Sequence, residues 1–169
     1  MALFGGKRDI SLFRHINREL LWDVVTQQCA IYQLKLSETS VNIYGEAAHE
    51  KFYNEPLLIN ALIERGDQSN PSSDMGVSLA RDMVFRFLRD DLVDAAFVPE
   101  VGDIVLYQES YFEINNVNDN QLFVGKDPDY PYGQNPLNPG LENFGTNLSI
   151  ICKAHHTPAD RVAIKNSRI

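Results

Sequence analysis

Two adjacent segments decide the fold class of this chain: Pro99-Glu100-Val101-Gly102-Asp103-Ile104-Val105-Leu106-Tyr107 and Tyr111-Phe112-Glu113-Ile114-Asn115-Asn116-Val117. In the second segment the apolar Phe112 and Ile114 alternate with polar residues, which is typical of a half-buried strand. Pro99 and Gly102 interrupt whatever precedes the first segment, and the link Gln108-Glu109-Ser110 is short enough for a hairpin. We therefore expect two antiparallel strands at the start of a small barrel or sandwich.

Residues 9–28 have the apolar spacing of an amphipathic helix, with Asp9 or Ser11 as its N-cap. Trp22 is expected to be a core residue or an interface anchor. The apolar side chains of this helix near one face are Ile10, Phe13, Leu20 and Val24, flanked by Leu12, Ile16 and Leu21. Arg14 and Arg18 fall elsewhere on the helix, so the pattern predicts a basic side and an apolar side.

The rest of the chain predicts a mainly β protein. Alternation or short apolar runs indicate strands at 29–36, 57–63, 77–88, 121–124 and 148–153, with short helical turns at 46–54 and 90–93. The expected fold class is a small antiparallel β-barrel or sandwich with an N-terminal amphipathic helix and long loops.

The length of 169 residues suits a single domain spanning 1–169. Within it we expect an N-terminal arm and helix over 1–28, a β-barrel over 29–154 and a C-terminal tail over 155–169. Two stretches rich in turn-forming residues, 66–76 and 127–146, predict long loops. Such appendages suit a subunit of an assembly, although long loops are also tolerated as simple surface excursions.

Charge is distributed unevenly along the chain. The net charge is −8, yet residues 1–18 carry four basic side chains against one acidic, so the remainder carries −11. An acidic body argues against non-specific nucleic-acid binding. The basic helix either docks on an acidic partner or forms a solvated face.

Two cysteines, Cys29 and Cys152, have no neighbour at metal-motif spacing and are expected to be buried, reduced thiols in strands. No apolar run approaches the ~20 residues that span a bilayer, and the first residues lack the order of a signal peptide. We therefore expect a protein made in a reducing host cytoplasm, with no membrane partner.

Catalytic and metal-binding patterns are weak in this sequence. His155 and His156 are adjacent on a predicted strand and so point to opposite faces, which disfavours a shared metal ion. The acidic group Asp90-Asp91-Asp94 either binds a cation or is a solvated helix end. We expect no catalytic residue, no metal and no cofactor, and hence not an enzyme.

Several segments resemble the neck proteins of T4-like tailed bacteriophages, the virion proteins that close the head and join it to the tail. The segment from Pro99 to Val117 resembles a barrel hairpin of that family. Two further stretches look similar to family elements that follow its first helix, namely Gln28-Cys29-Ala30-Ile31-Tyr32-Gln33-Leu34 and Asn42-Ile43-Tyr44-Gly45-Glu46-Ala47. Residues 29–124 follow the family's order, and the chain is shorter than such proteins at its C-terminus.

This resemblance implies a structural role at the head–tail junction of a virion. It implies a homo-oligomeric ring, expected to be a hexamer, that contacts a portal or adaptor protein on one side and a tail terminator or tail completion protein on the other. Genomic DNA would pass through the ring without sequence-specific binding, and loop 66–76 or 127–146 would line the channel or reach the next ring. The interface candidates are Arg8, Arg14, Arg18, Trp22, Asp74, Tyr130, Tyr132, Arg161 and Arg168.

Two alternatives remain open from the sequence. The same barrel hairpin suits another tail-side ring, such as a tail terminator or a baseplate barrel. A small-ligand-binding or enzymatic barrel would need a pocket with convergent polar groups, for which the candidates are Tyr107, Tyr111, His155 and Asp103.

Overall fold

A computed structural model describes residues 7–35, 39, 51–69, 72–73, 76–77, 80–119, 147–159 and 162. Six strands close into an antiparallel barrel in the order β1-β2-β5-β8-β7-β6, which confirms the mainly β prediction. Their bounds are Gln28–Tyr32 (β1), Leu57–Ser69 (β2), Ala80–Leu88 (β5), Ile104–Tyr107 (β6), Ser110–Asn118 (β7) and Ser149–Thr157 (β8).

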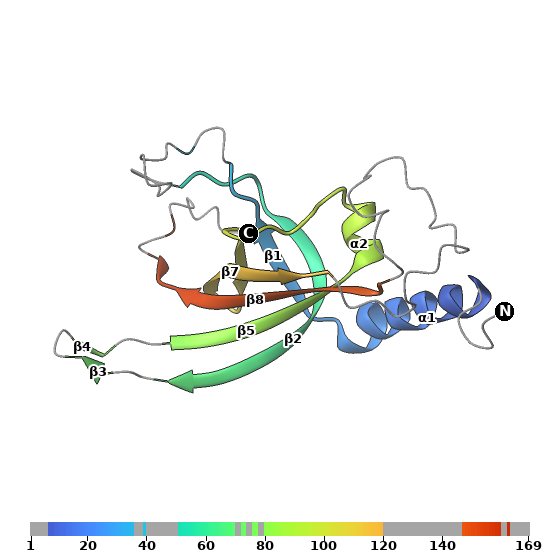
Figure 1. Cartoon of the computed structure of the whole chain (residues 1–169), viewed down its shortest axis with the longest axis horizontal. Coiled ribbons are helices and arrows are strands. Elements are labelled where there is room, and N and C mark those ends of the chain that lie inside the picture. The colour runs from blue at the N-terminus through green and yellow to red at the C-terminus, as the bar shows by residue number, and fades with distance from the viewer. Residues whose placement is uncertain are drawn as a thin grey trace.

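Helices and a small ribbon lie at opposite ends of this barrel (Figure 1). At one end, helix α1 (Lys7–Glu19) continues into a π-helical turn, η1 (Leu20–Val25), and the short helix α2 (Arg89–Asp94) follows β5. The two-residue strands β3 (Ser72–Ser73) and β4 (Gly76–Val77) pair with each other beyond the opposite end of the barrel strands.

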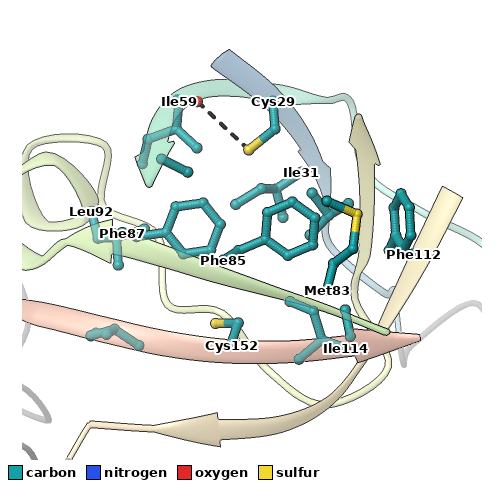
Figure 2. Close-up of a cluster of buried hydrophobic side chains, with 14 of the residues drawn as sticks. Cys29, Ile31, Ile59, Met83, Phe85, Phe87, Leu92, Phe112, Ile114 and Cys152 are labelled. Atoms are coloured by element: carbon teal, nitrogen blue, oxygen red, sulfur yellow. Dashed lines mark hydrogen bonds between the residues drawn. The ribbon is translucent and has the colours of Figure 1, made fainter. Parts of the chain in front are cut away.

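The barrel interior is filled by alternate side chains of its strands (Figure 2). Phe85, Phe87 and Phe112 are almost fully buried, and the Phe85 ring lies 6.4 Å from the Phe87 ring and 5.9 Å from the Phe112 ring, measured between centroids. Cys29 and Cys152 are buried among them as free thiols on β1 and β8, as predicted. Large aromatic side chains therefore supply much of the packing inside this six-stranded barrel.

The hairpin predicted at 99–117 is confirmed as β6 and β7. Gly102 has a φ of +98°, a conformation that suits glycine, and its N–H donates to the Ile114 carbonyl at 2.9 Å. The Ile114 N–H in turn donates to the Asp103 carbonyl at 2.9 Å. Gln108 and Glu109 both have positive φ, as a two-residue hairpin turn requires, so Ser110 begins β7 and does not belong to the link.

Asp103 ties this hairpin to the end of β1. Asp103 is 1% exposed, and its carboxylate accepts a hydrogen bond from the Leu34 N–H at 2.9 Å and another from the Glu100 N–H at 2.8 Å. Burial raises the pKa of the Asp103 carboxyl, and these two backbone hydrogen bonds work in the opposite direction. The Gly-Asp pair that stood out in the sequence thus has a structural role: its hydrogen bonds join the hairpin to the end of β1.

The prediction of a loop from residue 66 is wrong, because β2 continues to Ser69 and pairs with β5. The register shifts between Arg65 and Gln68, which marks a bulge in β2. A Cβ atom on Gly66 would lie 2.8 Å from the Asp82 carbonyl oxygen, so glycine permits the close approach of the two strands. Sequence alternation missed this extension because its residues are mostly polar.

Other predicted bounds also shift. The helix expected over 9–28 ends at Val25, where Thr26 adopts a left-handed conformation and its N–H bonds to the Leu21 carbonyl. Within the expected turn at 46–54, Tyr53 instead forms an isolated bridge with Leu34. Residues 155–157, assigned to the tail, belong to β8, whereas the turn at 90–93 is confirmed as α2. The predicted strand 121–124 and loop 127–146 lie outside the described residues.

Candidate assembly surface

Ion pairs fasten α1 to α2. The Arg14 guanidinium donates from Nε to Asp90 Oδ2 at 2.7 Å and from Nη2 to Asp90 Oδ1. The hydrogen bond to Asp90 raises the pKa of Arg14 above its ordinary value. Arg18 contacts two carboxylates of α2, with Nη2 at 3.0 Å from Asp94 Oδ2 and Nε at 3.3 Å from Asp91 Oδ1. The acidic group that the sequence offered as a cation site therefore faces two arginines of the same chain.

Trp22 completes this contact. Its indole Nε1 donates to Asp91 Oδ2 at 2.9 Å, and the Arg18 guanidinium carbon lies 5.5 Å from the centroid of the indole ring. The Trp22 side chain remains half exposed, whereas Asp91 is only 6% exposed and Leu21 is buried beside it. The structure thus brings together three of the predicted interface residues, Arg14, Arg18 and Trp22. Their side chains contact carboxylates of α2 in the same chain.

The opposite side of the helix carries partly exposed apolar side chains. We call this surface the apolar stripe; it consists of Leu12, Phe13, Ile16, Leu20 and Val24, whose exposed fractions range from 41% to 71%. Four of its members recur at every fourth residue, which keeps them near one side of a helix. A contiguous exposed apolar patch on a small protein commonly marks an interaction site.

A shallow apolar groove adjoins this stripe, between the helix and the barrel wall. Its volume is about 260 Å³, with Asn17, Arg86 and Ser149 at polar positions of its lining. We call it the α1 groove; its apolar lining is Leu20, Leu21, Val25, Leu62, Leu88 and Leu148. Sequence analysis did not find it, because its lining comes from the helix and from separate segments that only the folded barrel brings together.

A smaller pocket of about 160 Å³ is lined partly by residues of the bulge region of β2 and β5, away from the helices. Arg65 and Arg81 contribute to its lining together with Tyr107 and Gln108. The Arg65 guanidinium donates to the Gln108 side-chain oxygen at 2.9 Å, so this contact links the β2 bulge to the β6–β7 turn.

The four residues weighed for a ligand-binding or enzymatic barrel do not converge. Tyr107 packs on the interior core, with its ring edge-on to Phe85, whereas Tyr111 belongs to a separate cluster with Tyr32 and Ile104. Successive strand positions alternate between the two faces of the barrel wall, which places these tyrosines on opposite faces. His155 is exposed on β8, and Asp103 is occupied by its two backbone donors.

Metal ligands do not gather in the described part of the chain either, where no group of three or more His, Cys, Asp or Glu side chains could hold an ion. His155 is exposed whereas His156 is half-buried, with its ring edge-on to Phe112 at 5.9 Å. The two imidazoles therefore lie in different surroundings, as their adjacency on a strand predicts.

Of the remaining predicted interface residues, Arg8 belongs to α1 without a described side chain. The other five lie outside the described residues: Asp74, Tyr130, Tyr132, Arg161 and Arg168.

Comparison of the whole chain with protein-family models and with curated proteins finds no match. Over the residues that the structure describes, no helix combines the length and apolar character that crossing a membrane requires.

Proposed function

We propose that this chain is a structural subunit of the neck of a tailed bacteriophage. Copies of it would form a ring that helps to close the head after DNA packaging and connects the portal or its adaptor to the tail. The observation that carries this proposal is the closed barrel built around the hairpin at 99–117, the same stretch whose sequence resembles the neck proteins of T4-like phages.

The placement of the appendages supports an assembly role. The apolar stripe of α1 lies at one end of the barrel and the β3–β4 ribbon lies beyond the other (Figure 1). A subunit between a head-side and a tail-side ring needs contact surfaces at separate ends. The barrel interior is packed with apolar side chains, which suits a structural subunit.

Charge supports the DNA-conduit part of this proposal. Residues 19–169 carry a net charge of −11. An acidic wall repels the phosphate backbone, so it lets a duplex slide past without holding it. Arg14 and Arg18 of α1 are paired with carboxylates of α2 and so are not free to hold a polyanion.

Gene disruption in the phage that encodes this chain tests the proposal. We expect infected cells to accumulate filled heads and complete tails that fail to join, and expression of the chain from a plasmid to restore joining. Normal infectious particles from the disrupted phage would refute the role. Joined but tail-defective particles would instead favour the tail-terminator or baseplate alternative.

A further inference from the structure

We propose that the pocket between the β2 bulge and the β6–β7 turn binds a single phosphate group, either inorganic phosphate or that of a small phosphate ester. We call it the arginine pocket; the described residues that line it include Arg65, Arg81, Met83, Tyr107, Gln108 and Phe112. Such a site goes beyond the proposed structural role and does not depend on it.

Strand register places both arginines on the inner side of the barrel wall. Arg65 of β2 is the direct cross-strand partner of Met83, which is 2% exposed and belongs to the core. Arg81 lies two residues before Met83 on β5, so it shares that face. Asp82, between them in sequence, lies on the outer face, where its cross-strand partner is His155 of β8. The two guanidinium groups therefore line one pocket from the same side of the sheet.

The β2 bulge helps to fix this arrangement. The register between β2 and β5 shifts between Arg65 and Gln68, and a Cβ atom on Gly66 would lie 2.8 Å from the Asp82 carbonyl oxygen. A bulge bends its strand and redirects the neighbouring side chains, and bulges are frequent beside active sites. The bulge directly after Arg65 therefore sets where its guanidinium lies relative to the rest of the pocket.

The charge of the lining favours an anion. Two of the described lining residues are cationic and none of them is acidic. The Arg65 guanidinium donates to Gln108 Oε1 at 2.9 Å, and this neutral acceptor does not cancel its charge. Two like charges that line one small pocket repel each other, and an anion bound between them offsets this repulsion. The pocket is thus a local concentration of positive charge on a chain whose net charge is −8.

Size and donor chemistry favour a phosphate group. The volume of about 160 Å³ is below the range of about 300–1,000 Å³ of pockets that enclose a drug-sized ligand, so the pocket suits one small group. Met83 and Phe112 of the core cluster contribute the apolar part of the lining (Figure 2). The polar part consists of groups that can donate, namely the two guanidinium groups, the Tyr107 hydroxyl and the Gln108 amide.

A phosphate monoester carries about −1.5 to −2 charges at pH 7 and three acceptor oxygens, and guanidinium groups bind phosphate through paired hydrogen bonds. A carboxylate carries one charge and two oxygens, so it matches two guanidinium groups less well. A nucleic-acid duplex brings many phosphates toward a chain that carries −8, whereas a small ligand brings only one group to the two arginines. A small phosphorylated ligand therefore fits best.

The test is a titration of the ¹⁵N-labelled full-length chain with inorganic phosphate, followed by NMR of the backbone amides at an ionic strength held constant with sodium chloride. We expect the amide signals of Gly66 and Gln108 to shift saturably, with a Kd of about 1 mM or below. Acetate should bind about tenfold more weakly or worse. No saturable shift at these amides up to about twenty times that concentration would overturn the site. Equal affinity for acetate would overturn the assignment of phosphate.

Substitution of the arginines tests the residues themselves. Arg65→Gln and Arg81→Gln should each weaken phosphate binding about tenfold or more, because each removes a charged donor. Arg86→Gln is the matched control: it makes the same change of charge on β5, where Arg86 contacts Glu64, and should leave the phosphate affinity unchanged. Wild-type affinity in a folded Arg65→Gln chain, or an equal loss in Arg86→Gln, would overturn the role of the arginines.

Circular dichroism of the phosphate-free variants verifies that they are folded. The two arginines are replaced separately, so a variant that does not fold leaves the other to decide, and the wild-type titration decides without either. A short DNA duplex added in place of phosphate should not shift the Gly66 and Gln108 signals. Shifts as large as those with phosphate, lost in Arg65→Gln, would overturn the assignment of a small ligand.

Discussion

Removal of the Asp103 carboxylate should lower the stability of this fold. Its two carboxylate oxygens accept from the Leu34 and Glu100 backbone N–H groups and so join β1 to the hairpin. We expect Asp103→Ala to lower the free energy of unfolding by about 2 kcal/mol or more, because both donors lose their acceptor. Urea denaturation followed by circular dichroism measures this. A loss below about 0.5 kcal/mol, typical of a surface substitution, would contradict this structural role of Asp103.

The same carboxyl predicts a pH dependence. Burial raises its pKa above the ordinary value of 3.8, so the folded state holds the proton more tightly than the unfolded state does. The stability that this group contributes is therefore greatest below pH 3.8 and falls as the pH rises through the folded pKa. We expect the free energy of unfolding of the wild type, minus that of Asp103→Asn, to fall over this interval and then level off. A difference that rises with pH would show that the carboxylate is stabilised by its surroundings.

The two thiols give a prediction about reactivity. Burial raises the pKa of Cys29 and of Cys152 to about 12, and both side chains lie in the barrel core. Because the thiolate is the reactive species, we expect neither to be alkylated by iodoacetamide at pH 8 in the native protein and both to react in urea. Mass spectrometry of the labelled chain counts the adducts. Rapid labelling of the native chain at either position would mean that the core opens locally.

At the scale of elements, we expect the attachment of α1 to depend on Asp91 more than on Asp94. The Asp91 side chain is 4% exposed and contacts both Trp22 and Arg18, whereas that of Asp94 is 62% exposed. We expect Asp91→Ala to lower the free energy of unfolding by about 1–3 kcal/mol, because the Trp22 indole and the Arg18 guanidinium both lose a buried acceptor. Asp94→Ala is the control and should change it by less than about 1 kcal/mol.

Trp22 is the only tryptophan of the chain, so its fluorescence reports on this contact. Asp91→Ala should shift the emission of Trp22 and Asp94→Ala should not. Equal effects of the two substitutions would mean that the helices are held by general charge attraction and not by the Asp91 contact.

Local signals explain which elements were predictable. Pro99, Gly102 and strict alternation around Phe112 mark the β6–β7 hairpin without reference to the rest of the chain. The extension of β2 to Ser69 was missed because a mostly polar strand lacks the alternation that marks a half-buried one. The sequence also did not indicate which side of α1 packs against the rest of the protein, since Arg14 and its partner Asp90 are 76 residues apart.

At the scale of the whole molecule, six strands and an aromatic core make a closed barrel with appendages at both ends (Figure 1). Composition and periodicity were sufficient to predict the barrel class. Of the candidate site, the sequence supplied Arg14, Arg18 and Trp22 but neither their partners on α2 nor the α1 groove, because both arise only from tertiary packing.

The most direct test of the neck proposal is cryo-electron microscopy of virus particles purified from the source of this chain. We expect the barrel to fit into a symmetric ring between the portal assembly and the tail. Particles whose head–tail junction contains no density that fits this barrel would contradict the proposed function.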